Sequence, residues 1–180
     1  SGGMSFPTGS IDERGDTPRG KNTPVPYTMQ IGSGTYDLQP GFLYMGHSGD
    51  LRWGAELSTK LRLGRNKKNY SLGDRGSFSA WLKKRTTPWL EPSAKATFIY
   101  WEPIDGRDAD LDPSVASVAD PTLFGGYRAL ASAGLEISPT PSSEAGWTLS
   151  AEAGIPIYQK LNGPQPGLDW QMTCSLSHGF

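Results

Sequence analysis

Strict alternation of apolar and polar residues over long segments is the feature that most constrains the fold of this chain. In residues 51–63 the odd positions are mostly apolar, and the charged residues all fall at even positions: Arg52, Glu56, Lys60 and Arg62. A helix would scatter these charges around its circumference, whereas a strand places all of them on one face. The segment therefore predicts a long β-strand with one apolar face and one charged face.

The same two-residue period recurs along the chain. Alternating segments are found at residues 36–44, 76–84, 93–101, 127–137, 147–157 and 168–180, and residues 4–7 resemble the end of a further strand. Trp81, Ile99 and Trp101 interrupt the pattern by falling on polar sides. The 23 glycines, 15 prolines and 11% aromatic residues suit many strands joined by turns rather than helices. We expect about eight strands in an all-β, antiparallel domain over residues 1–180, with residues 1–3 as a cloning remnant or a truncation edge.

The connections between the expected strands alternate in length. Long or fairly long connections at residues 8–34, 64–75, 102–122 and 159–167 are separated by shorter ones at 47–50, 86–89 and 138–146. Outer-membrane barrels have short turns on one side of the membrane and longer loops on the other. Tryptophan and tyrosine also gather near strand ends, as in an interfacial aromatic girdle. Ten residues tilted by about 45° span roughly 23 Å, close to the apolar band of such proteins. These features predict an antiparallel transmembrane β-barrel.

Composition excludes several classes of function. The net charge of −1 gives no electrostatic footprint for nucleic acid, so no nucleic-acid partner is expected. The mean hydropathy of −0.48 does not argue against a membrane barrel, because alternating strands average to near-soluble values. The chain has no nucleophile elbow, phosphate-cradling loop or assembled catalytic set. We therefore expect neither an enzyme nor a cofactor.

The last segment of the sequence, DWQMTCSLSHGF, resembles the C-terminal assembly signal of Gram-negative outer-membrane barrels. The residues that match the signal are Met172, Cys174, Leu176 and Phe180. His178 departs from it, because an aromatic or aliphatic residue is usual there. The resemblance implies a location in the outer membrane of a Gram-negative bacterium, in contact with its lipids and with the barrel-assembly machinery.

A wider resemblance covers nearly the whole chain. The segments that carry it, in order, are FPTGSIDERGDTP, MQIGSGTYDLQPGFLYMG, LRLGRNKKNYSLGDR, YWEPIDGRDADLDP and GIPIYQKLNGPQ. They are similar to the outer-membrane transporter family associated with the meta-pathway of phenol degradation. The resemblance implies a channel or transporter for small aromatic or hydrophobic solutes. It also implies that the chain is the C-terminal portion of a larger barrel, because members of the family have further strands before the FPTGS segment.

The polar faces of such a barrel would line its lumen. The residues expected there are Arg52, Glu56, Lys60, Arg62, Lys95, Arg128, Glu136, Glu152 and Asp169. They could form a charged lining that selects solutes, or they could pair across neighbouring strands and fill a narrow lumen. The near balance of positive and negative residues favours pairing.

The remaining polar motifs have simpler interpretations. The carboxylates of residues 105–112 miss the spacing of a calcium loop and are expected in a solvated external loop, and the basic run at residues 64–70 at a solvated hairpin tip. His47 and His178 are not at a metal-binding spacing, so no metal site is expected. Met45 with His47 would bind copper only with partners from elsewhere.

A second class of function stays open. A non-conducting barrel, or a β-sheet module whose apolar faces bury one another, would act as a structural, partner-binding or metal-handling scaffold.

Overall fold

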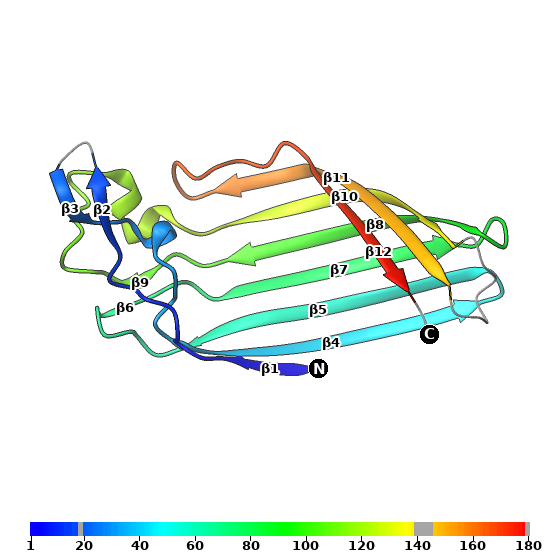
Figure 1. The fold of residues 1–180 in the computed structure, drawn as a ribbon, viewed down its shortest axis with the longest axis horizontal. Helices are drawn as coiled ribbons and strands as arrows, with labels where there is room; N and C mark the ends of the chain where they lie inside the picture. Colours follow the sequence, from blue (N-terminus) through cyan, green and yellow to red (C-terminus); the bar gives the residue numbers. More distant parts are fainter. Residues whose placement is uncertain (18–19, 139–145, 179–180) are drawn as a thin grey trace.

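The computed structural model describes residues 1–17, 20–138 and 146–178. Within these residues the main feature is an antiparallel sheet of eight strands in the order β1-β4-β5-β7-β8-β10-β11-β12 (Figure 1). The strands are β1 (Gly2–Ser5), β4 (Tyr36–Ser48), β5 (Leu51–Leu63), β7 (Arg75–Lys84), β8 (Leu90–Trp101), β10 (Gly126–Ile137), β11 (Trp147–Leu161) and β12 (Gln171–His178). The expected all-β, antiparallel fold is confirmed. Residues 2 and 3 belong to β1, where they pair with Pro40 and Gln39.

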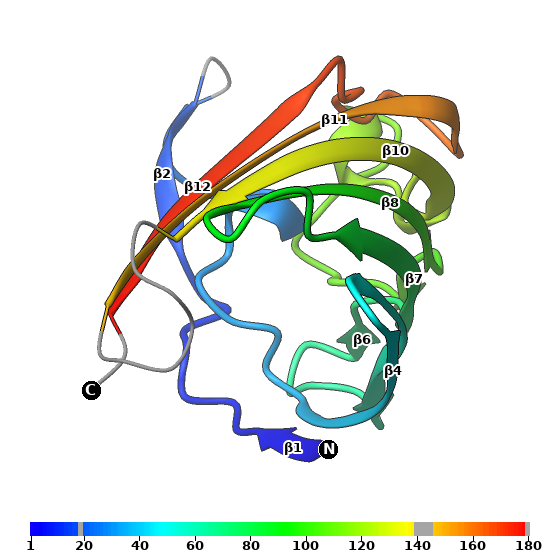
Figure 2. The ribbon, with the colours of Figure 1, turned by 90° about the vertical axis from the view of Figure 1, so that its right-hand side faces the viewer.

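The sheet is curled but open. Its edge strands, β1 and β12, are not hydrogen-bonded to each other within the described residues (Figure 2). The expected sheet is therefore present without the closure that would make it a barrel. A bulge between β10 and β11 adds local twist, because Ala129 faces Tyr158 while Leu130 faces Pro156, which leaves Ile157 as an extra residue.

The long connections gather at one end of the sheet, on the left of Figure 1. They contain short elements: β2 (Arg14–Thr17), β3 (Gly20–Pro24), β6 (Tyr70–Ser71), β9 (Asp105–Gly106), and the 3-10 helices η1 (Tyr27–Met29), η2 (Ser117–Ala119) and η3 (Pro121–Leu123). β2 and β3 pair within the first connection, and pairing of β6 with β9 ties the second connection to the third. We call residues 8–17, 20–34, 64–74 and 102–125 the loop cap. The opposite end of the sheet, which carries the shorter connections, is the turn end.

The apolar rows predicted from the alternation lie in register on one face of the sheet. Leu57 of β5 faces Phe78 of β7, which in turn faces Phe98 of β8. All three side chains are close to half exposed. Apolar residues of β10, β11 and β12 on the same face are half exposed or more: Leu135, Leu149, Ile155, Met172 and Leu176. In the described part of the chain, no second layer covers this face. No helix there is long and apolar enough to cross a membrane.

Candidate functional site: the concave face of the sheet

Most charged residues of the strands lie on the concave face, and three ion pairs among the described residues reach over an intervening strand. Arg52 of β5 donates to Glu91 of β8, passing over β7. The same geometry joins β7 to β10 and β8 to β11, through the pairs Lys83–Glu136 (2.8 Å) and Lys95–Glu152 (3.2 Å). Strands two apart are separated by roughly 10 Å, so only long side chains on the inside of the curve can meet in this way. The expected pairing is present, but these three pairs skip one strand, whereas Asp37 and Arg62 pair across the neighbouring strands β4 and β5.

Small residues beneath these pairs make the crossings possible. A Cβ atom on Gly134 would lie 2.7 Å from the Ser93 hydroxyl oxygen, and one on Gly154 would lie 2.4 Å from that of Ser132. Larger side chains at these positions would collide with the neighbouring strand. The glycines and serines therefore leave space on the concave face, through which the charged side chains of neighbouring positions extend.

A further ion pair lies nearer the loop cap, between Asp37 of β4 and Arg62 of β5. Asp37 is only 1% exposed. Its carboxylate also accepts a hydrogen bond of 2.7 Å from the Thr35 hydroxyl. The backbone N–H of Arg62 donates to Asp74 Oδ1 at 2.7 Å. The ion pair with Asp37 therefore holds the Arg62 guanidinium against the concave face, and the bond to Asp74 anchors the Arg62 backbone.

The structure places eight of the nine expected lumen residues on this face, and the exception is Asp169. Strand β12 begins at Gln171, three residues later than the alternation indicated, so Asp169 lies exposed in the connection before it. Glu56, Lys60 and Arg128 reach the concave face without an ion-pair partner among the described residues.

Sequence reasoning missed several charged residues of the same face: Asp37, Arg75, Lys83 and Glu91. Asp37 and Lys83 fall on the polar sides of expected strands, so the alternation alone could have placed them. Arg75 and Glu91 lie just outside the expected segments, because β7 and β8 each begin earlier than the pattern indicated.

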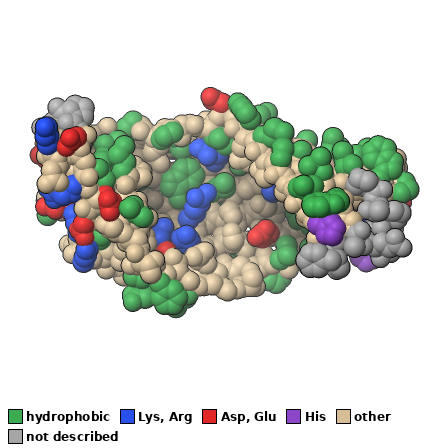
Figure 3. Space-filling model, viewed as in Figure 1, with side chains coloured by type: hydrophobic (Ala, Val, Ile, Leu, Met, Phe, Trp, Pro, Cys, Tyr) green, Lys and Arg blue, Asp and Glu red, His purple; other side chains and the backbone are tan. Residues whose placement is uncertain are grey.

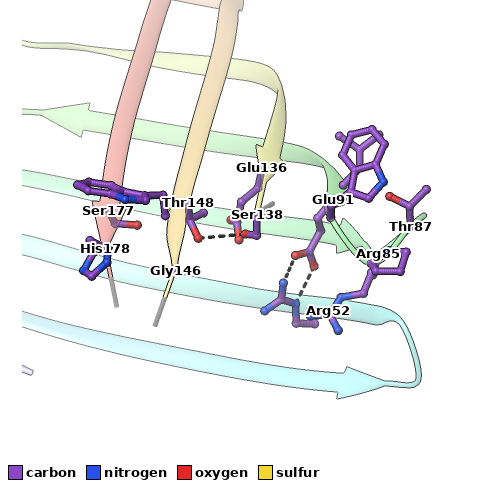
Figure 4. A pocket seen from close by; sticks show the side chains of 14 residues that line it. Arg52, Arg85, Thr87, Glu91, Glu136, Ser138, Gly146, Thr148, Ser177 and His178 are labelled. Atoms are coloured by element: carbon purple, nitrogen blue, oxygen red, sulfur yellow. Dashed lines mark hydrogen bonds and ion pairs between the residues drawn. The ribbon is translucent and has the colours of Figure 1, made fainter. Parts of the chain in front are cut away.

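A series of hollows runs along the concave face from the turn end to the loop cap. The hollow at the turn end has about 410 Å³ and is lined by Arg52, Glu91, Glu136 and His178, among others (Figure 4). The next has about 550 Å³ and also includes Arg52. Glu56 is shared between that hollow and one of about 340 Å³. In Figure 3, basic and acidic side chains are visible inside the hollowed face. Shared lining residues thus connect one end of the sheet to the other.

Met45 and His47 line the middle hollow, where a copper site would require further ligands. No group of three or more His, Cys, Asp or Glu residues that could hold a metal ion occurs within residues 1–17, 20–138 and 146–178. His178 lies on β12 with its ring 4.7 Å from that of Trp147.

The loop cap has a hydrophobic core of its own, which the sequence pattern did not indicate. Tyr27, Tyr70 and Ile104 are buried, and Leu72, Leu111 and Phe124 pack around them. The Tyr27 ring meets that of Tyr70 edge-on at 4.8 Å, and its hydroxyl accepts a hydrogen bond from the backbone N–H of Asp108. Three connections far apart in sequence are therefore held in one packed unit.

Ion pairs reinforce the loop cap. Lys68 lies 3.0 Å from Asp108 and 3.1 Å from Asp110, and Arg65 lies 2.8 Å from Asp105. Partial burial alone would lower the pKa of Lys68, but the two carboxylates together raise it above its ordinary value. The hydrogen bond from Arg65 lowers the pKa of Asp105. The expectation of a solvated acidic loop is wrong for Asp108, because its side chain is buried and paired with Lys68.

We expect the buried Tyr70 phenol to ionise above its ordinary pKa of 10.0, because burial raises that pKa. The folded pKa lies above the unfolded one, so the stabilisation from the neutral phenol is complete below pH 10 and is lost as the pH rises through the raised value. The difference in absorbance at 295 nm between the natural chain and Tyr70→Phe, followed against pH, should show a midpoint above 10. A midpoint at 10 would mean that the phenol is solvated and the cap is not packed as described.

Comparison with known proteins identifies no relative of this chain. No protein-family model matches the chain, and neither curated proteins nor solved structures gave a match.

Proposed function

We propose that this chain forms the wall of an outer-membrane β-barrel channel or transporter for small solutes in a Gram-negative bacterium. The observation that carries the proposal is the exposed apolar face, on which aligned leucine, phenylalanine and isoleucine side chains of successive strands stand uncovered. Monomeric soluble proteins rarely expose a continuous apolar surface of this kind. Hydrocarbon would cover it, and the charged concave face would then surround an aqueous lumen.

Two further features agree with this proposal. The long connections lie together at one end of the sheet and the short ones at the other, as in outer-membrane barrels. Met172, Cys174 and Leu176 stand exposed on the apolar side of β12, where the assembly machinery would read them, while Phe180 lies outside the described residues. In a full barrel, further strands would join β1 to β12, as the family resemblance implies.

A non-conducting scaffold is the second candidate, and the ion pairs favour it. The pairs Lys83–Glu136 and Lys95–Glu152 cross the concave face, and the loop cap covers one end. Side chains arranged in this way could fill a narrow lumen instead of lining an open one.

Purification and reconstitution should separate these functions. We expect the chain to require detergent, to migrate differently on SDS gels before and after heating, and to give discrete conductance steps in planar bilayers. An inserted but electrically silent barrel would favour the scaffold. A chain that stays folded and monomeric in plain buffer would contradict both membrane functions.

A further inference from the structure

The hollow beneath the loop cap differs in chemistry from the others on the concave face. It has about 410 Å³ and lies where β5, β7, β8 and β10 meet the cap. Arg62, Arg75 and Arg128 contribute to its lining, and Glu102 is the acidic residue among the lining residues that the structure describes. The hollow at the turn end, by comparison, balances Arg52 and Arg85 with Glu91 and Glu136. Positive charge is therefore in excess at the cap end.

The arginines of this hollow differ in how far they are already satisfied. Arg62 is paired with Asp37, although its Nε atom is buried without a hydrogen-bond partner among the described residues. Arg75 and Arg128 have no carboxylate partner among the described residues. The Nε atom of Arg128 is buried without a hydrogen-bond acceptor. The buried Nε–H is costly to leave unpaired, but it has no exposed surface that a ligand could reach. An anion in the hollow would instead pair with the outer N–H groups of the Arg128 guanidinium, which no carboxylate among the described residues occupies.

The other wall of the hollow is apolar and held in place. Trp101, Ile99, Ile104 and Phe124 line it. The indole of Trp101 lies 5.8 Å from the Arg128 guanidinium carbon, and its N–H donates to Gln165 at 3.3 Å.

Gln165 is itself anchored, because its amide donates to the carbonyl oxygens of Leu123 and Gly125 at 3.2 and 2.7 Å. The apolar surface is thus in position before any ligand arrives, which lowers the entropic cost of binding.

We propose that this hollow binds a small carboxylate with an apolar or aromatic body. The carboxylate lies between Arg75 and Arg128, whose planar guanidinium groups match its two oxygens, and the body lies against Trp101. An inorganic anion would leave the apolar wall in water, and a neutral apolar solute would leave Arg128 unsatisfied. The inference rests on the proposed channel function, because it names the class of solute that the channel would carry. Binding to the hollow can nevertheless be measured without any assumption about conductance.

Binding to the chain in detergent micelles tests the inference, with empty micelles as the blank. The probes are benzoate, its neutral analogue benzamide, and acetate, which carries the charge without the ring. We expect benzoate to bind at least tenfold more tightly than either. Arg128→Gln should reduce benzoate affinity about tenfold, to the level of benzamide, and Arg75→Gln should have an effect in the same direction. Trp101→Leu should weaken benzoate binding more than acetate binding.

Lys84→Gln is the matched control, because it removes one positive charge from the exposed end of β7, where Lys84 faces Leu51 on the apolar side of the sheet. It should leave the binding of benzoate unchanged. Equal affinity for benzoate and benzamide overturns the inference, as does an equal loss in Lys84→Gln and Arg128→Gln. If Arg128→Gln does not fold, Arg75→Gln decides on the same criterion.

The proposed channel function is tested separately, by conductance of potassium chloride without any aromatic solute. A conducting chain that binds benzoate no better than benzamide overturns the inference and leaves the function standing. A chain that binds benzoate selectively but neither inserts nor conducts supports the inference and contradicts the function.

Discussion

Replacing Leu57 with arginine is expected to lower the free energy of unfolding in lipid vesicles by about 2–4 kcal/mol, the cost of a cation on the lipid side of a barrel near the bilayer midplane. Leu57 is the central residue of β5, is 48% exposed, and lies between Phe42 of β4 and Phe78 of β7. If this face meets hydrocarbon, the arginine cannot be hydrated there. Denaturant unfolding in vesicles, followed by tryptophan fluorescence, measures the change.

Leu57→Ala is the control, because it shortens the side chain without adding charge and should cost clearly less than Leu57→Arg. A face in water would respond differently, since an exposed substitution away from special features changes stability by about 0.5 kcal/mol or less. An effect of that size for Leu57→Arg in vesicles would show that the apolar rows do not meet lipid. The result would count against both membrane functions at once.

The sequence predicted most strands closely where the alternation was unbroken. Residues 51–63 were expected as one strand, and β5 has those bounds. The pattern is informative here because each side chain lies either on the apolar face or on the charged concave face of the sheet. The polarity of a residue therefore indicates the face on which it lies. At β12 the agreement was poorer, because the polar residues near Leu168 continue the same period into a segment that is not paired with β11.

Trp81 and Trp101 show why polarity alone was insufficient on the concave face. Both fell on the polar side of expected strands and looked like defects in the pattern. A Cβ atom on Gly54, across from Trp81, would lie 2.5 Å from the indole ring. The indole ring of Trp81 thus covers Gly54 on the neighbouring strand. This packing depends on the combination of a large and a small residue across the two strands, and not on the hydropathy of either one.

The loop cap and the ion pairs could not be derived from local sequence at all. Tyr27 and Tyr70 are 43 positions apart, and Lys68 reaches Asp108 across 40. The lengths of the connections predicted that these loops would lie at one end of the sheet. The packing of the loops against one another depends on how far the sheet curls. The same curvature brings Lys95 to Glu152 over β10, so the charged lining was predictable as a set while its partners were not.

Asp37→Asn is expected to lower the free energy of unfolding by about 3 kcal/mol, because it removes one partner of a buried ion pair and leaves the other charge uncompensated. The Arg62 side chain is 14% exposed and Asp37 is more buried still. The double variant Asp37→Leu with Arg62→Met should recover most of the loss, since replacing both charges with apolar groups removes the unpaired cation.

Asp105→Asn is the control, because it breaks the exposed pair with Arg65 in the loop cap and should have little effect on the free energy of unfolding. Guanidinium unfolding of the four chains, natural and variant, measures these differences. A loss for Asp37→Asn no greater than that for Asp105→Asn would mean that Arg62 is solvated, and that water fills the concave face beside β4 and β5.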